Sequence, residues 1–323
     1  MSGLLERTAY APAPIGPDGI RTDPFALVNR HGATLRGVVH RPPGRRGPGP
    51  VVILLPGLGM SRRHTVLPAL YFLAAGVTVV RADLTNSVGW SDGEMADFTL
   101  SRACDDLDDL AVWSALRLAA APLAVVAASA TGRAAFRVAA RAPRLVDFVG
   151  TVGAVVDVRA SLSDIQGADL VGGWTAGAVG DGGHGMLFGH NVRLAGLRSL
   201  VEDNWCSLES TRADLARATG TRFLDVHGEH DPYVPVADVR AAFATAGDAA
   251  VHVLAGAGHE LDLTATRAAL DRLVRAHAVR CGRPAPPGPG PRSDELSALN
   301  RVERLIRAWW AETVRPPAGT VAR

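Results

Sequence analysis

The sequence predicts an α/β fold, in which a mostly parallel sheet carries helices on both faces and holds an inserted cap. Three observations predict it. Apolar segments of strand length alternate with amphipathic segments of helical length, an order typical of parallel sheets. The chain has 323 residues, 47% of them hydrophobic and 20% charged, which is enough for one large core. Residues 157–218 break the alternation, as an inserted segment does.

The predicted strands differ in how they are covered. Ala33–His40 alternates apolar and polar residues, as a half-buried strand does, whereas Val51–Leu55 is continuously apolar and typical of a strand covered on both faces. Ser101 is the expected N-cap of a long amphipathic helix. In chain order the predicted strands span 33–40, 51–55, 77–80, 123–128, 146–156, 221–226 and 250–254, and the predicted helices span 61–75, 101–118, 130–140, 237–246 and 263–276.

The interrupting segment, 157–218, is the predicted cap. It contains a glycine-rich stretch, Gly172–Gly189, which also carries large apolar side chains. Ligands of α/β proteins bind at the carboxyl edge of the sheet, so we expect the cap to cover that edge. The core is then formed by residues 1–156 and 219–281.

A third part of the chain, 282–323, follows this core. Gly282–Arg292 is rich in Pro and Gly and predicts a linker. Glu295–Val314 has apolar residues at helical spacing and predicts a C-terminal helix. This helix either packs on its own domain, which is the simpler arrangement, or joins two copies into a homodimer.

Composition excludes several classes of function. The net charge is only +2, which gives no basis for a nucleic-acid partner. All 34 basic residues are Arg, so lysine-dependent catalysis is excluded. The three cysteines have neither metal nor disulfide spacing. The N-terminus does not resemble a signal peptide, and no apolar run is long enough to span a bilayer. We therefore expect a cytoplasmic protein without metal or other cofactor.

A candidate nucleophile, Ser129, lies where a predicted strand passes directly into a helix. The residues two positions away, Ala127 and Thr131, are small. Such a tight strand-to-helix turn strains the backbone of the serine and exposes its hydroxyl. Because Ala127 and Thr131 replace the usual glycines of G-x-S-x-G, an ordinary helix N-cap serine is an equally good interpretation of this segment alone.

Two further polar residues follow predicted strands. Asp231 lies in the segment LDVHGEHDPYVP, and His259 lies in GAGHE. The chain order Ser, Asp, His is that of the α/β-hydrolases. A serine hydroxyl needs a base, and the base needs a carboxylate that fixes its tautomer. We therefore predict a catalytic triad of Ser129, Asp231 and His259. Glu229 is an alternative carboxylate, but Asp231 fits the strand-end spacing better.

An oxyanion hole needs two N–H donors. The predicted donors are Ala130, just after the serine, and Leu58, in the turn after the first buried strand, with Gly59 as a rival. His227 and His230 flank the Asp231 loop and are interpreted as surface groups or as supports of the site.

Several segments, in other loops as well as at the predicted triad, carry a more specific resemblance. They are Gly57-Leu58 with Arg62-Arg63-His64, Ser87–Gly93 with Asp97–Ser101, Ala128-Ser129 with Arg133, Asn204-Trp205 with Leu208–Thr211, and Gly256–His259. Together they resemble the acyltransferase (myristoyl-acyl-carrier-protein thioesterase) family of bacterial bioluminescence, over Val51–Leu273. Thr131, where the family has a second serine, and Leu58, where an aromatic is usual, are departures.

The resemblance implies cleavage of an acyl thioester through an acyl-Ser129 intermediate. The substrate would be a fatty or polyketide-like acyl-CoA or acyl-carrier-protein thioester, with an acyl carrier protein as partner. A carboxylester or lactone hydrolase, a chain-releasing cyclase of a biosynthetic pathway, and a non-catalytic binding protein on a hydrolase scaffold are the alternatives. The side chains expected to wall an acyl pocket are Trp174, Met186, Leu187, Phe188 and Trp205.

Overall fold

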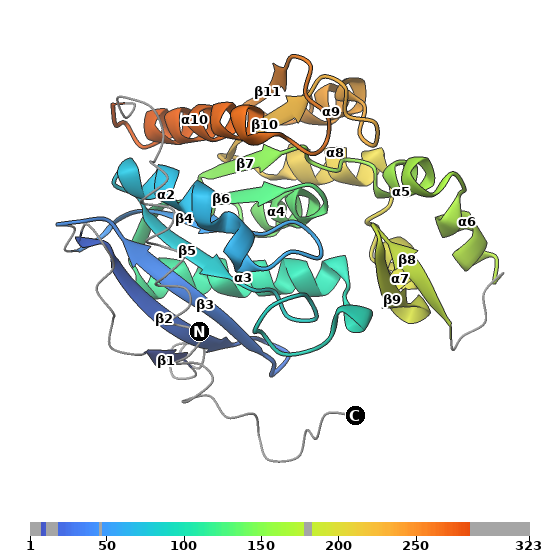
Figure 1. Cartoon of the computed structure of the whole chain (residues 1–323), viewed down its shortest axis with the longest axis horizontal. Coiled ribbons are helices and arrows are strands. Elements are labelled where there is room, and N and C mark those ends of the chain that lie inside the picture. The colour runs from blue at the N-terminus through green and yellow to red at the C-terminus, as the bar shows by residue number, and fades with distance from the viewer. Residues whose placement is uncertain (1–7, 11–18, 45–46, 178–182, 285–323) are drawn as a thin grey trace.

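The computed structural model describes residues 8–10, 19–44, 47–177 and 183–284 (Figure 1). The C-terminal helix predicted at 295–314 and most of the predicted linker lie outside the described residues. Within the described ranges, no helix combines the length and the apolar character needed to cross a bilayer.

One large sheet forms the centre of the protein. Its strand order is β1-β2-β3-β5-β4-β6-β7-β10-β11. The six strands from β5 to β11 run parallel, whereas β1, β2 and β3 pair antiparallel to their neighbours. The predicted mostly parallel sheet is therefore confirmed. The strands are β1 Thr8–Tyr10, β2 Arg21–Val28, β3 Thr34–Arg41, β4 Gly49–Leu54, β5 Thr78–Ala82, β6 Ala120–Ala128, β7 Phe148–Val152, β10 Arg222–Gly228 and β11 Ala249–Leu254.

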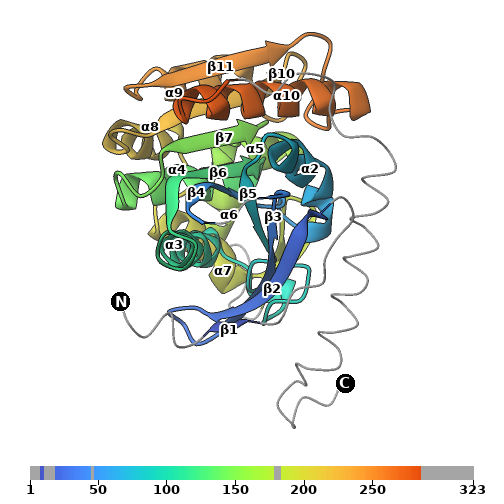
Figure 2. The ribbon, with the colours of Figure 1, turned by 90° about the vertical axis from the view of Figure 1, so that its left-hand side faces the viewer.

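Helices cover both faces of this sheet (Figure 2). Alternate residues of the central strands point to opposite faces, so that Val51 and Ile53 pack with α3 and α4 while Val52 and Leu54 pack with α2 and α10. The helices on the first face are α3 Leu100–Arg117, α4 Ala130–Arg141, α8 Leu208–Arg217 and α9 Val236–Phe243, and those on the second are α2 Val66–Ala74 and α10 Leu263–Arg280.

Three details differ from the sequence-based prediction. The strands β1 and β2 were not predicted, because the first half of β2 is polar. The strand predicted at 146–156 ends at Val152, since Gly153 turns the chain with φ +59°. The predicted N-cap Ser101 was wrong: Thr99 caps α3 by accepting a hydrogen bond from the Arg102 N–H.

The inserted segment lies beyond the carboxyl ends of the parallel strands (Figure 1). Its last helix, α8, packs against α4 and α9 of the core. We therefore propose that the cap ends before α8, near residue 207. Its elements are α5 Val158–Gln166, α6 Leu170–Thr175, the antiparallel hairpin of β8 His184–Leu187 and β9 His190–Arg193, and α7 Leu194–Glu202.

Candidate active site

Ser129 occupies a strained turn between β6 and α4. Its backbone has φ 53° and ψ −128°, a positive φ that non-glycine residues rarely adopt. The turn is held on both sides, since the Ser129 N–H donates to the Val152 carbonyl at 3.0 Å and its own carbonyl accepts from the Gly132 N–H at 3.0 Å. A Cβ at Gly132 would come within 3.1 Å of the Thr151 side chain, so helix and strand approach closely here.

The structure brings Ser129, His259 and Asp231 into one hydrogen-bonded line. Ser129 Oγ lies 3.0 Å from His259 Nε2, and His259 Nδ1 lies 2.6 Å from Asp231 Oδ2. Because a carboxylate can only accept, His259 Nδ1 must carry the proton and Nε2 is left to accept from the serine hydroxyl. The arrangement can thus take a proton from Ser129.

The Asp231 carboxylate is buried and saturated with donors. Its Oδ1 accepts the N–H groups of Tyr233 at 2.9 Å and Val234 at 3.0 Å, while its Oδ2 faces His259. Burial alone would raise the pKa of Asp231, but hydrogen bonds with His227 and His259 hold that pKa well below its usual range. Asp231 is therefore expected to be ionised beside His259.

A second buried pair, Asp225 and His227, lies on the strand that leads to Asp231. His227 Nδ1 is 2.8 Å from Asp225 Oδ2, and both side chains are fully buried. Burial alone would lower the pKa of His227, but hydrogen bonds with Asp225 and Asp231 and the charge of Asp225 raise it to about 10. From the sequence, His227 was open to either a surface or a supporting role, and Asp225 was not predicted to belong to the site. The spacing of two residues, which places both on one face of β10, was the available signal.

The loop after β4 is tied to the serine turn. Thr131 Oγ donates to the Pro56 carbonyl at 3.0 Å and also lies 2.8 Å from the Ala128 carbonyl. Leu58 lies in this loop and Ala130 begins α4, whose first N–H groups have no partner within the helix. The two predicted oxyanion donors thus belong to segments joined by one side chain.

The cap hairpin contacts the same loop. Gly59 has φ +70°, and a Cβ at this position would overlap the imidazole of His190 on β9. Arg193, at the end of β9, pairs with Asp97 at 2.5 Å, which fixes the other end of the hairpin to the core. The cap therefore packs against the loop that carries Leu58.

The five predicted pocket residues of the cap segment differ in burial. Trp174, Leu187 and Trp205 are buried, Phe188 is half-buried and Met186 is 40% exposed. Trp205 lies under the guanidinium groups of α4, and its Nε1 donates to Ser101 Oγ at 2.7 Å.

A small apolar hollow adjoins the serine turn on the α2 and α10 side of the sheet. Its volume is about 110 Å³. Its lining comes from the core rather than from the cap, and includes Leu54, Pro56, Met60, Ala128, Val152 and Leu270. Ala128 directly precedes Ser129, so the hollow begins next to the candidate nucleophile.

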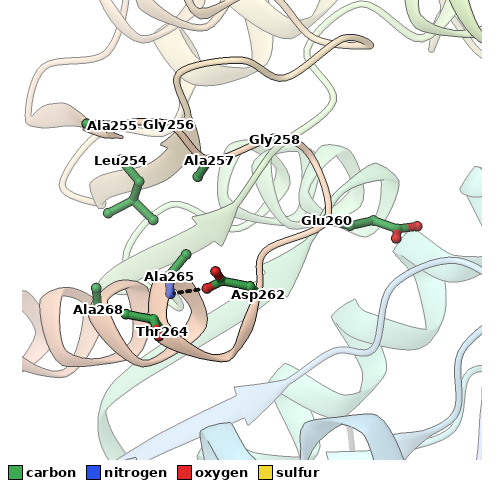
Figure 3. Close-up of a pocket in the computed structure, with 10 residues that line it drawn as sticks. All are labelled: Leu254, Ala255, Gly256, Ala257, Gly258, Glu260, Asp262, Thr264, Ala265 and Ala268. Carbon is green, nitrogen blue, oxygen red and sulfur yellow. Dashed lines mark hydrogen bonds between the residues drawn. The ribbon is translucent and has the colours of Figure 1, made fainter.

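A second pocket, of about 390 Å³, lies between the loop 254–258 and the first turns of α10 (Figure 3). Asp262 caps α10 there by accepting from the Ala265 N–H at 2.7 Å. Neither Ser129 nor Asp231 lines this pocket. Across the described ranges, no three or more His, Cys, Asp or Glu side chains are grouped to hold a metal ion.

Comparisons with known proteins agree with this architecture. A family model described as "Acyl transferase" matches residues 49–275. No curated protein matches the sequence.

Est1E from Butyrivibrio proteoclasticus, with ferulic acid bound, is a similar solved structure at 15% identity and TM-score 0.64, over 79% of this chain and 99% of its own. The α/β hydrolase GrgF from Penicillium sp. sh18 is similar at 21% identity and TM-score 0.57, over 81% and 99%. Acetyl xylan esterase 1 from Thermoanaerobacterium sp. JW/SL YS485 is similar at 18% identity and TM-score 0.58, over 82% and 87%.

Proposed function

Since the chain belongs to this acyl transferase family, that of the bacterial bioluminescence acyltransferases, and has the α/β-hydrolase fold, we propose that it transfers acyl groups from thioesters through Ser129. One observation carries the proposal: the unbroken line from Ser129 Oγ through His259 to Asp231, with separations of 3.0 and 2.6 Å. The substrates we propose are acyl-CoA or acyl-carrier-protein thioesters.

In the first half of the reaction, Ser129 Oγ attacks the thioester carbonyl carbon while His259 Nε2 takes the hydroxyl proton. The resulting tetrahedral oxyanion is placed at the N–H groups of Leu58 and Ala130. The carbon–sulfur bond then breaks, and His259 gives its proton to the leaving thiolate. The product is an ester of Ser129, and the negative Asp231 stabilises the transient imidazolium.

In the second half, water or another hydroxyl acceptor attacks the acyl-serine carbonyl. His259 takes the proton of the acceptor, the carbon–Oγ bond breaks, and the proton returns to Ser129 Oγ. The enzyme is restored and the acyl group leaves as an acid or a new ester.

The acyl chain is proposed to enter the hollow beside Ala128. Its lining is mostly apolar, with His64 and Thr65 as the polar members, and it begins at the residue before the nucleophile. Its volume of about 110 Å³ is small beside typical ligand pockets of roughly 300–1,000 Å³, so it accommodates only a short acyl segment.

The test is to incubate the protein with acyl-CoA and acyl-carrier-protein thioesters of varied chain length, with aryl esters in parallel, and to follow intact mass. We expect an acyl adduct from thioesters that is missing in Ser129→Ala, and its mass reports the preferred chain. Turnover of aryl esters alone would favour a carboxylester hydrolase. Absence of both adduct and turnover would favour a binding protein.

A further inference from the structure

The Asp231 carboxylate has a histidine on either side. Its Oδ2 lies 2.6 Å from His259 Nδ1 and 3.3 Å from His227 Nε2. The His227 ring also lies 2.8 Å from Asp225 and 2.9 Å from the Val234 carbonyl. A continuous chain of contacts therefore runs from Asp225 to Ser129, which extends the triad by two buried residues.

We propose that His227 is a positioning residue that, as an imidazolium, places one positive charge between the buried carboxylates of Asp225 and Asp231. In this role it keeps Asp231 ionised and aimed at His259. The proposal rests on the proposed function only in that Asp231 and His259 belong to the catalytic line.

The charges of the buried groups support this role. With a neutral His227, the ionised carboxylates of Asp225 and Asp231 would lie on two sides of an uncharged ring in the interior. The repulsion between two buried anions favours protonation of one of them. If Asp231 took that proton, His259 would lose the anion that fixes its tautomer. An imidazolium at 227 removes the conflict. It leaves a net charge of minus one, which the protonated His259 of the transition state neutralises.

Both ring nitrogens of His227 face acceptors: Nδ1 lies 2.8 Å from Asp225 Oδ2, and Nε2 lies 2.9 Å from the Val234 carbonyl and 3.3 Å from Asp231 Oδ2. Because an acceptor supplies no proton, both nitrogens must carry one. On the neighbouring β7, Thr151 donates its hydroxyl to Asp225 Oδ1 at 2.6 Å. On β11, the residue opposite His227 is the apolar Val253. The titratable groups that hydrogen-bond with His227 are thus Asp225 on its own strand and Asp231 on the loop, and His259 lies beyond Asp231.

The test is the pH dependence of kcat/KM for His227→Gln, with the ester or thioester that the wild type turns over fastest. We expect the midpoint of the acidic limb to rise by about one pH unit, because the loss of the cation favours protonation of Asp231 and of His259. The plateau value of kcat/KM should fall by roughly tenfold, because the Asp231 carboxylate loses its fixed position. An equal loss at every pH would show a merely structural role and overturn the proposal.

His277→Gln is the matched control. His277 lies on α10 and is also a buried histidine, but its neighbours are aromatic. Its ring centroid lies 5.7 Å from that of Phe72 and 5.8 Å from that of Phe148. Its profile should keep the wild-type midpoint. Ser129→Ala separates the two proposals: if that variant keeps full turnover, the proposed function fails, whereas an unshifted His227→Gln profile contradicts only the role of His227.

A measurement on the unaltered protein covers the case in which His227→Gln does not fold. Ring nitrogen NMR should show one histidine that is protonated on both nitrogens at pH 8 and remains so to about pH 9, in line with the pKa of about 10. The same signal should be missing in Asp225→Asn, which removes one of its anions. A spectrum in which every histidine ring is neutral at pH 8 would overturn the proposal.

Discussion

Arg133, four residues after Ser129, forms an ion pair with Asp214 in which Nη1 and Oδ2 are 2.6 Å apart and neither side chain is exposed. Arg137, one turn further along α4, also contacts Asp214, and its guanidinium lies 3.6 Å from the centre of the Trp205 ring. The helix that begins at the serine therefore holds α8 and the end of the cap. Some of the segments that carry the family resemblance meet here: Arg133 lies 5.0 Å from the centre of the Trp205 ring, and its Nη2 donates to Ser210 Oγ at 3.2 Å.

We predict that Asp214→Asn destabilises the protein by about 3–5 kcal/mol, because it leaves a buried guanidinium without its carboxylate. Thermal unfolding should show a Tm lower by roughly 10 °C. Asp271→Asn is the control, since its pair with Arg275 is exposed to solvent and contributes little to stability. An equal fall in Tm for the two substitutions would contradict the stabilising role of the buried Arg133–Asp214 pair.

The same pair predicts a pH dependence of stability. Burial alone would raise the pKa of Asp214, but Arg133 and Arg137 lower it below its ordinary value. A carboxyl with a lowered folded-state pKa stabilises the fold above its unfolded value of about 3.9, and this contribution disappears as the pH falls through the folded-state value. The difference in unfolding free energy between wild type and Asp214→Asn should therefore narrow below about pH 4. Denaturant titrations at pH 7, 4 and 3 measure it.

The α/β fold could be predicted from the sequence because buried parallel strands are apolar runs, and the comparisons confirm it. β2 was missed because its polar residues find partners only in the folded sheet: Thr22 bonds with His40 at 2.8 Å, and Asp23 pairs with Arg21 and Arg41. Ser101 was misjudged as a cap for the same reason, since its hydroxyl bonds with Trp205, 104 residues away.

For the candidate site, strand-end position and chain order were enough to select Ser129, Asp231 and His259, which the structure brings together. The Asp225–His227 pair could not be recognised in the same way, because a polar pair on a strand is compatible with either a surface or the interior. Its burial depends on packing that no local pattern records. The catalytic roles of the three triad residues and the positioning role of His227 are predictions that the experiments above test.

Thr131 offers a test of one departure from the resemblance described above, which implies a serine at this position. We predict that Thr131→Ser keeps activity close to wild type, because the hydroxyl still reaches the Pro56 carbonyl. Thr131→Ala should lower kcat/KM by roughly two- to tenfold, as one hydrogen bond of about 0.5–1.5 kcal/mol no longer fixes the Leu58 loop. Steady-state kinetics of both variants test this prediction. Equal kcat/KM values for Thr131→Ala and Thr131→Ser would show that the hydroxyl is dispensable.

The contact between Gly59 and His190 predicts coupling between the cap and the Leu58 loop. Gly59→Ala should reduce kcat/KM, because it adds a Cβ at positive φ and displaces the imidazole. His190→Ala in the same chain removes the overlap but not the backbone strain, so it should restore part of the loss. A double-mutant cycle measures the coupling, which we expect to be about 0.5–3 kcal/mol. Strictly additive effects would mean that the two residues act independently.

The apolar hollow beside Ala128 makes a prediction about chain length. Leu270→Ala enlarges the hollow, and we expect the preferred acyl chain to lengthen, because the removed side chain is part of its lining. Leu273→Ala is the matched control: it lies one turn along the same helix, is equally buried, and does not line the hollow. Both variants should lose about 2–5 kcal/mol of stability, since both leave a cavity. The ratio of kcat/KM for long and short acyl donors should change only in Leu270→Ala; a parallel change in both variants would place the acyl chain elsewhere.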